Sequence, residues 1–218
     1  HGAKQVKRAV TRIQNSAEEA EKGEYKHFML KEIYEQPQVI QDTLDGRISH
    51  NAALEAAFGV KAKAIFNKVK RVQIVACGTS FHAGQVAKYW FESIARLPCQ
   101  VDIASDYRYR DIIVQPGTLF LTISQSGETA DTLAALRYAS EKPYVASLAI
   151  CNVATSSLVR ESDFCILTMA GREIGVASTK AFTTQLTLLL ILSIVLARRT
   201  GLKPSQESKL IKELAKLP

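Results

Sequence analysis

The chain has 218 residues, 47% of them hydrophobic, which is enough for one domain with a substantial buried core. Its formal net charge is +7, but the basic surplus is shared between residues 1–72 and 73–218, which argues against nucleic-acid binding. The four cysteines have no CxxC spacing, so we expect no zinc site, no other metal and no disulfide framework, and a cytoplasmic location.

Residues 1–24 are predicted to be a linker remnant. Basic side chains near the start are followed by an acidic run at 18–21, a pattern more typical of a solvated surface than of a binding arm. No Met opens the sequence, so we expect a piece of a longer protein. In residues 25–44, apolar side chains recur at roughly helical spacing, and Pro37 divides the stretch into two predicted helices.

Short apolar runs alternate with helical patterns in the rest of the chain. Strands are predicted at 72–76, 100–104, 118–123, 145–150 and 164–168. This alternation predicts an α/β fold, with a doubly wound parallel sheet of about five strands flanked by helices. We predict that residues 25–218 form this domain, with the first two helices as an N-terminal extension.

A long helix is predicted over 178–199, and its stretch from Leu186 to Ala197 is almost entirely apolar. That stretch is shorter than the roughly 20 residues of a membrane span, and Thr183 and Thr184 precede it, so we expect no membrane insertion. The helix should be buried in a core or at a subunit contact. Because so large an apolar face is hard to bury in one small domain, we expect a homodimer.

Two predicted strand-to-helix turns are rich in hydroxyl groups. The turn SQSGET at 124–129 lies between the strand at 118–123 and a helix predicted from Glu128, and the turn CGTS at 77–80 follows the strand at 72–76. The first N–H groups of a helix lack intrahelical partners, and with neighbouring hydroxyls they suit a phosphate. The alternative is a helix cap without a ligand, since Ser and Thr are common at that position.

In an open parallel sheet, such turns meet at the carboxyl ends of the strands, so the two turns should line one pocket. Gly127 would allow close approach of the backbone to a ligand, and Glu128 should point outward because an inward carboxylate would repel an anion. Cys77 is interpreted as a buried thiol and His82 as a residue of the helix surface. The candidate donors are Thr79, Ser80, Ser124, Gln125, Ser126 and Thr129.

Several sequence blocks together carry a family resemblance. They are KEIYEQP at 31–37, CGTS at 77–80, SQSGETADTL at 124–133, SLAICNV at 147–153, SSLVRESD at 156–163 and EIGVASTKAFTTQL at 173–186. In this combination the chain resembles the first sugar isomerase (SIS) domain of the glucosamine-6-phosphate synthase family. The joint presence of the blocks is far more specific than any one of them.

The resemblance implies the sugar-phosphate-binding half of an isomerase that turns fructose 6-phosphate and glutamine-derived ammonia into glucosamine 6-phosphate. It implies phosphate contacts for five residues, a sugar contact for Thr79, and a sugar-lining role for Val176 and Ser178. The five are Ser80, Ser124, Gln125, Ser126 and Thr129. No cofactor is implied.

The family's glutaminase domain and second isomerase domain, with the catalytic groups they supply, have no counterpart in these residues. We therefore expect no catalytic residue here, and a chain that binds the sugar phosphate without converting it. Two alternatives stay open. A sugar-phosphate sensor would use the same turns, although the sensors carry a further binding domain, and a nucleotide-binding fold is disfavoured because neither turn reads GxGxxG.

Overall fold

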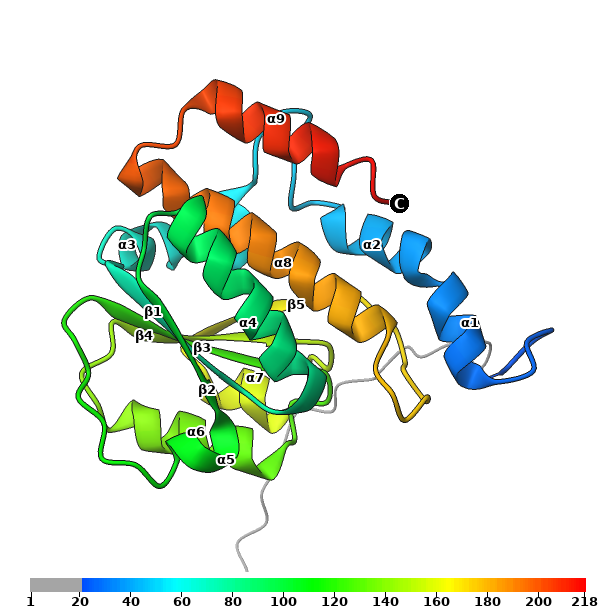
Figure 1. The fold of residues 1–218 in the computed structure, drawn as a ribbon, viewed down its shortest axis with the longest axis horizontal. Helices are drawn as coiled ribbons and strands as arrows, with labels where there is room; N and C mark the ends of the chain where they lie inside the picture. The colour runs from blue at the N-terminus through cyan, green and yellow to red at the C-terminus, as the bar shows by residue number, and fades with distance from the viewer. Residues whose placement is uncertain (1–20) are drawn as a thin grey trace, which may run out of the picture.

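The computed structural model describes residues 21–218, so most of the predicted linker lies outside the described residues (Figure 1). A five-stranded sheet forms the centre, with strand order β2-β1-β3-β4-β5 and parallel pairing throughout. The strands are β1 (Arg71–Ala76), β2 (Cys99–Ile103), β3 (Thr118–Ser124), β4 (Ala146–Cys151) and β5 (Phe164–Leu167). The predicted fold class and all five strands are confirmed.

Helices cover both faces of the sheet (Figure 1), which explains why every residue of the central strand β3 is buried. One face packs against α2 (Gln36–Leu44), α3 (Ala62–Phe66), α4 (Gly78–Ser93), α8 (Lys180–Ala197) and α9 (Pro204–Leu214), with the short turns η2 (Glu55–Phe58) and η3 (Arg198–Thr200). The other face packs against α5 (Ala104–Tyr107), α6 (Ala130–Ser140) and α7 (Ser157–Glu161). The domain therefore has three layers.

The apolar helix α8 belongs to the core of the domain. With η3 it forms a stretch, Lys180–Thr200, that is long and apolar enough to cross a membrane, so the prediction that its length excludes a span is wrong. Burial provides the better argument, because 78% of the apolar window is buried inside the domain. The same burial contradicts the reason given for a homodimer, since one domain does bury this helix.

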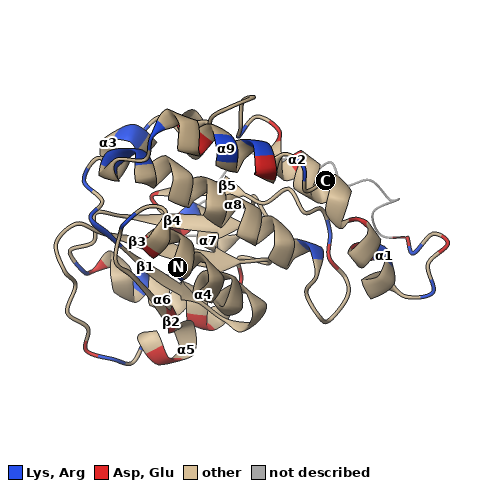
Figure 2. Ribbon diagram, turned by 45° about the horizontal axis from the view of Figure 1, so that its top comes forward, with Lys and Arg blue, Asp and Glu red and all other residues tan. Residues whose placement is uncertain are grey.

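The N-terminal extension begins with α1 (Phe28–Tyr34) and continues with α2. Pro37 lies in the first turn of α2, where its missing N–H costs no hydrogen bond, and the two helices are separated at Glu35 as predicted. Figure 1 shows α1 beside the loop that leads into α8. Figure 2 shows Lys and Arg on several elements, most densely around α3, with Asp and Glu interspersed.

Candidate functional site

The candidate site lies between β1 and β3, where the order of the strands in the sheet changes direction relative to the sequence. Strands β1 and β3 are neighbours, although β2 lies between them in the sequence. The chain leaves β1 toward α4 on one face and leaves β3 toward α6 on the other, so the two turns diverge and open a crevice. A cavity of about 430 Å³ occupies this position. We call it the carboxyl-edge cavity.

Three segments line the carboxyl-edge cavity, and all eight residues predicted to bind ligand are among them. The lining comprises Cys77, Gly78, Thr79, Ser80, Ile123, Ser124, Gln125, Ser126, Thr129, Thr132, Val176, Ala177 and Ser178. The five lining residues that were not predicted as contacts are Cys77, Gly78, Ile123, Thr132 and Ala177. Thr132 lies one helical turn after Thr129, and that i, i+3 spacing was the signal that would have found it.

The turn after β1 supplies the first wall. Its helix, α4, begins at Gly78, and no side chain caps it at Cys77. Gly78 has a positive φ of 56°, a conformation that suits glycine at this tight turn. Ser80 is only 7% exposed, whereas Cys77 is half-buried and faces the cavity, so the prediction of a buried thiol at Cys77 is wrong.

The turn after β3 supplies the second wall, and two of its hydroxyl oxygens accept hydrogen bonds from backbone N–H groups of the same turn. Ser124 Oγ accepts a hydrogen bond from the N–H of Gly127 at 2.9 Å, and Ser126 Oγ accepts one from Glu128 at 3.2 Å. The hydroxyl proton of Ser126 stays available to donate to a ligand, and Ser124 Oγ and Thr129 Oγ1, 3.5 Å apart, share one contact in which either can donate. Helix α6 begins at Ala130, two residues later than predicted, and Thr129 makes no side-chain cap. A simple helix cap therefore does not account for these hydroxyls.

Gly127 is required by packing rather than by a ligand. Its φ is +67°, and a Cβ added there would lie 2.2 Å from Ser156 Oγ and 2.7 Å from Cys151 Sγ. Gly127 is not among the residues that line the cavity. The close approach that was predicted at this position is therefore made to the start of α7, and the ligand-related interpretation is wrong.

Glu128 points away from the cavity, as predicted. Its Oε1 accepts the N–H of Ser157 at 2.7 Å, so it caps the neighbouring helix α7 rather than its own helix. This backbone hydrogen bond holds the pKa of Glu128 below its usual value. His82 is exposed on α4, as predicted, and does not line the cavity.

The loop at 171–179 supplies the third wall through Val176, Ala177 and Ser178. Ser178 Oγ donates to Glu173 Oε2 at 3.0 Å, which leaves the lone pairs of the hydroxyl able to accept from a ligand. Glu173 Oε1 also accepts the N–H groups of Thr179 and Ala181. One carboxylate thus fixes the turn from the loop into α8.

Asn152, after β4, joins the second wall to the base of this loop. Its N–H donates to the carbonyl of Gln125 at 3.3 Å, and its side-chain Oδ1 accepts from Thr168 Oγ1 and Ala170 N, each at 2.9 Å. Its Nδ2 donates to the carbonyl of Gly171 at 2.6 Å. The two walls are therefore joined by one residue outside the cavity lining, through its backbone N–H on one side and its side chain on the other.

The lining chemistry suits an anion bound by neutral donors. None of the thirteen lining residues is Lys, Arg, His, Asp or Glu, so the positive potential comes from the N-termini of α4 and α6. The lining likewise has no carboxylate or imidazole that could move a proton. Within residues 21–218, no three His, Cys, Asp or Glu side chains cluster as a metal site would require.

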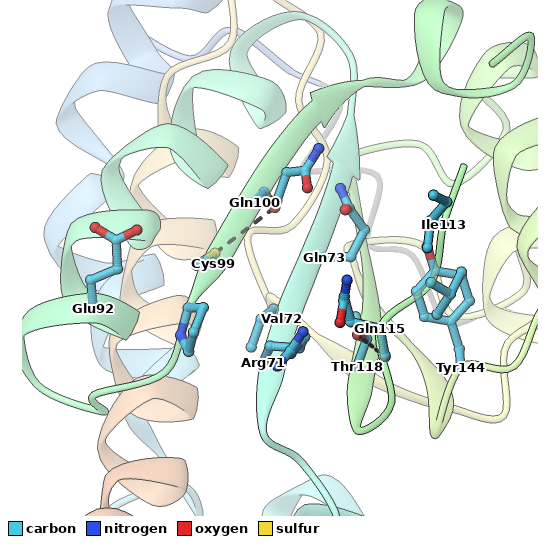
Figure 3. A pocket seen from close by; sticks show the side chains of 12 residues that line it. Arg71, Val72, Gln73, Glu92, Cys99, Gln100, Ile113, Gln115, Thr118 and Tyr144 are labelled. Carbon is cyan, nitrogen blue, oxygen red and sulfur yellow. Dashed lines mark hydrogen bonds between the residues drawn. The ribbon is translucent and has the colours of Figure 1, made fainter. Parts of the chain in front are cut away.

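A second, smaller cavity of about 240 Å³ lies at the other end of the sheet, beside the amino ends of β1, β2 and β3 (Figure 3). We call it the amino-edge cavity. Arg71 and Glu92 line it, and Arg71 Nε has no hydrogen-bond partner among residues 21–218. Gln73 and Gln100 both donate to Asp102, and burial raises the pKa of Cys99 to about 12. No feature selected from the sequence lies there.

A family model described as SIS domain matches residues 65–195. The chain belongs to the SIS domain family. The matched stretch runs from the end of α3 into α8 and contains all three segments that line the carboxyl-edge cavity.

Two curated relatives of this SIS domain chain carry the same name. Glutamine–fructose-6-phosphate aminotransferase (isomerizing) of Pseudomonas syringae pv. tomato is 61% identical over 214 residues, and the protein of that name from Aliivibrio fischeri is 51% identical over 215 residues. Each match covers 98% of the chain but only 35% of the relative. The resemblance seen in the sequence is confirmed, and the chain spans about a third of the length of these relatives.

Solved structures agree with the sequence relatives. The C-terminal domain of glucosamine-fructose-6-phosphate aminotransferase from Francisella tularensis is 52% identical with a TM-score of 0.87, over 89% of this chain and 55% of that one. A putative phosphosugar isomerase from Silicibacter pomeroyi is 30% identical with a TM-score of 0.68, over 86% of this chain and 55% of that one. Both share the SIS fold.

Proposed function

We propose that this SIS domain chain is the sugar-phosphate-binding half of the isomerase part of an aminotransferase. The whole enzyme would convert fructose 6-phosphate and glutamine-derived ammonia to glucosamine 6-phosphate. The observation that carries the proposal is the carboxyl-edge cavity, in which two uncapped helix N-termini and a set of neutral donors converge. The names of the relatives support the choice of fructose 6-phosphate over other phosphorylated sugars.

In the proposed complex the phosphate lies between the two strand-to-helix turns. Ser126 Oγ only accepts within the turn, so its proton would donate to a phosphate oxygen, and the Ser124–Thr129 hydroxyl pair would leave at least one further proton for the phosphate. Thr79, Val176 and Ser178 lie on the remaining lining and would contact the sugar. The donors assigned to the phosphate are Ser80, Ser124, Gln125, Ser126 and Thr129.

The chain by itself should bind the sugar phosphate without isomerising it. Moving a proton between adjacent sugar carbons requires a general base within hydrogen-bond reach of them, and the lining offers no carboxylate, imidazole or amine. We propose that the base is supplied by the remaining length of the longer protein, together with the glutaminase activity.

The decisive experiment combines binding and turnover in one sample. Fructose 6-phosphate is titrated into the purified chain while the amide resonances of residues 124–129 are followed, and aldose formation is assayed in the same tube. The expected result is a saturable shift without product. Absence of any shift would overturn the binding proposal, and product above the rate of a Ser126→Asp variant would show that a catalytic group lies within the chain.

A homodimer in the cytoplasm completes the proposal. The support is now an exposed apolar side of α1, formed by Met29, Leu30, Ile33 and Tyr34, of which Tyr34 is 65% exposed. Sedimentation at tens of micromolar tests the dimer, because about −6 kcal/mol of association free energy suffices there. A single monomeric species at that concentration would contradict it.

A further inference from the structure

Helix α1 of the N-terminal extension holds the 171–179 loop through a buried carboxylate. Glu32 is only 2% exposed, and its Oε1 accepts the consecutive N–H groups of Ile174 at 2.6 Å and Gly175 at 2.9 Å. Figure 1 shows this loop beside α1. The next residue of the loop, Val176, already lines the carboxyl-edge cavity. The backbone conformation at the cavity wall is therefore set from α1, more than 140 residues earlier in the sequence.

The contact is close from the side of the loop as well. A Cβ added to Gly175 would lie 2.5 Å from Glu32 Oε2, so a residue with a side chain at position 175 would displace the carboxylate. Glu32 Oε2 has no hydrogen-bond partner among residues 21–218. Burying a carboxylate is costly, and an apolar residue would attach α1 to the domain more cheaply. The buried Glu32 carboxylate is therefore better explained by a role in fixing the loop backbone than by a role in attaching α1 to the domain.

A second carboxylate of the same segment anchors the far end of the loop. Glu35 Oε2 lies 2.7 Å from Nζ of Lys180, the first residue of α8, and Lys180 is only 4% exposed. Thr183 on α8 also donates to Gln36, one residue after Glu35. The loop is thus fixed to the N-terminal extension in its middle and at its end, on either side of Val176 and Ser178.

We propose that Glu32 and Glu35 are positioning residues that give the cavity its affinity for the sugar rather than for the phosphate. The inference rests on the proposed function, since it assigns the 171–179 loop to the sugar end of the ligand. The hydrogen bonds of the Glu32 and Glu35 carboxylates go to Ile174, Gly175 and Lys180 and not to the turns after β1 and β3, so phosphate binding should not depend on either carboxylate.

The experiment compares two probes, fructose 6-phosphate and inorganic phosphate, on the full chain. In Glu32→Ala the dissociation constant for fructose 6-phosphate should rise about tenfold, whereas that for inorganic phosphate should stay within about twofold. Glu32→Gln should recover part of the loss, because its amide oxygen can accept the same two N–H groups. Gly175→Ala, which leaves Glu32 intact but displaces it, should reproduce the selective loss.

Glu207→Ala is the matched control. Glu207 is also a buried carboxylate, 6% exposed, and its Oε1 also accepts a backbone N–H, that of Ala53, but it lies outside the cavity. Its removal should lower stability without changing either affinity. Hydrogen exchange provides a readout without ligand, since the amides of Ile174 and Gly175 should exchange faster in Glu32→Ala than in Glu207→Ala.

The possible outcomes separate this inference from the proposed function. Equal weakening of both probes in Glu32→Ala, or no weakening of fructose 6-phosphate, would overturn the positioning role, as would unchanged exchange of the two amides. Failure of both probes to bind the unaltered chain would overturn the proposed function instead. Selective weakening with faster exchange supports the inference.

Discussion

The two cavities lie at opposite ends of the same sheet and obtain their polarity in different ways. The carboxyl-edge cavity has no ionised side chain in its lining and is surrounded by hydroxyls and helix N-termini. The amino-edge cavity has Arg71 and Glu92 in its lining (Figure 3). The neighbouring Asp102 accepts hydrogen bonds from Gln73 and Gln100. One cavity offers oriented backbone dipoles, and the other offers side-chain charges of both signs.

This difference follows from topology. In a parallel α/β sheet every helix that follows a strand begins at the carboxyl edge, so the positive ends of the helix dipoles gather there and the negative ends gather at the amino edge. The carboxyl edge would therefore stabilise a phosphate without a basic side chain, as the proposed function requires. The comparison predicts that charge changes at one edge affect phosphate binding strongly and those at the other edge weakly.

The largest expected effect is that of Ser126→Asp. The new carboxylate would occupy the region assigned to the phosphate, and repulsion between two anions in a partly enclosed site should weaken fructose 6-phosphate binding by more than about a hundredfold. Gln115→Glu is the matched control, because it adds the same charge to the lining of the amino-edge cavity. Calorimetric titration should find the affinity of that control within about twofold of the unaltered chain.

Both variants test the assignment of the phosphate to one edge. Unchanged affinity in Ser126→Asp would remove the phosphate from the turn after β3. A loss of affinity in Gln115→Glu comparable to that in Ser126→Asp would show that the amino-edge cavity contributes to binding.

A smaller but substantial effect is expected for Asn152→Leu. The substitution leaves the N–H of Ala170 and the carbonyl of Gly171 without their present partner, at a cost of about 2–4 kcal/mol in the free energy of unfolding. The backbone bond to Gln125 stays, but the base of the 171–179 loop loses its side-chain link to the end of β4, so binding should weaken as well. Urea denaturation measures the first effect and ligand titration the second.

Asn67→Leu is the control for this prediction. Asn67 is exposed and accepts a hydrogen bond from Arg199 Nε at 3.0 Å, far from the cavity in the fold. Its loss should cost less than about 1 kcal/mol and leave binding unchanged. Equal losses of stability in the two variants would contradict the bridging role of Asn152.

The sequence was sufficient for the sheet and for the hydroxyl turns because both depend on local patterns. Apolar runs of strand length gave all five strands, and the order of strand, polar turn and helix gave Thr79 and Ser126 their place at one edge. Val176 and Ser178 were found only through the family resemblance, because a loop carries no periodic signal. Contacts between distant segments, such as Glu32 with Gly175, are not readable from spacing at all.

The errors also have physical reasons. Cys77 follows a buried strand, which suggested a buried thiol, but the residue is only half-buried and is one of those that line the cavity. Gly127 was assigned to the ligand because a glycine beside hydroxyls usually marks close approach, and the neighbour that approaches is Ser156 of the same domain. In both cases the residue type indicated a special environment, but only the tertiary structure shows which groups surround the residue.

Ser126→Ala should have a moderate effect. It removes one donor to the phosphate without adding charge, which corresponds to about 0.5–1.5 kcal/mol of binding free energy. Ser140→Ala removes a hydroxyl that donates to the carbonyl of Arg137 on the surface of α6, and should not change the affinity. The same calorimetric titration compares the two. A loss in Ser126→Ala as large as that in Ser126→Asp would mean that the aspartate acts by disrupting the turn rather than by its charge.

The smallest expected effect on ligand affinity is that of Glu128→Gln. This variant tests whether a carboxylate next to the turn, but outside the cavity lining, influences binding in the cavity. Glu128 is exposed and caps α7, and the hydrogen bond from Ser157 lowers its pKa. A lowered pKa in the folded state means that the carboxylate contributes stability above its unfolded pKa, near 4.5, and that the contribution is lost as pH falls through the folded value.

Thermal melts between pH 7 and pH 3 should therefore show a shallower acid-side decline for Glu128→Gln than for the unaltered chain. Glu213→Gln is the control at a distance. The hydrogen bond from Lys216, just after α9, likewise lowers the pKa of Glu213, so the loss of this carboxylate should also flatten the decline. At pH 7 neither variant should change the affinity for fructose 6-phosphate by more than about twofold. Markedly tighter binding in Glu128→Gln alone would mean that the Glu128 carboxylate repels the bound phosphate. The contrast between the two cavities would then fail, because a side-chain charge would also act at the carboxyl edge.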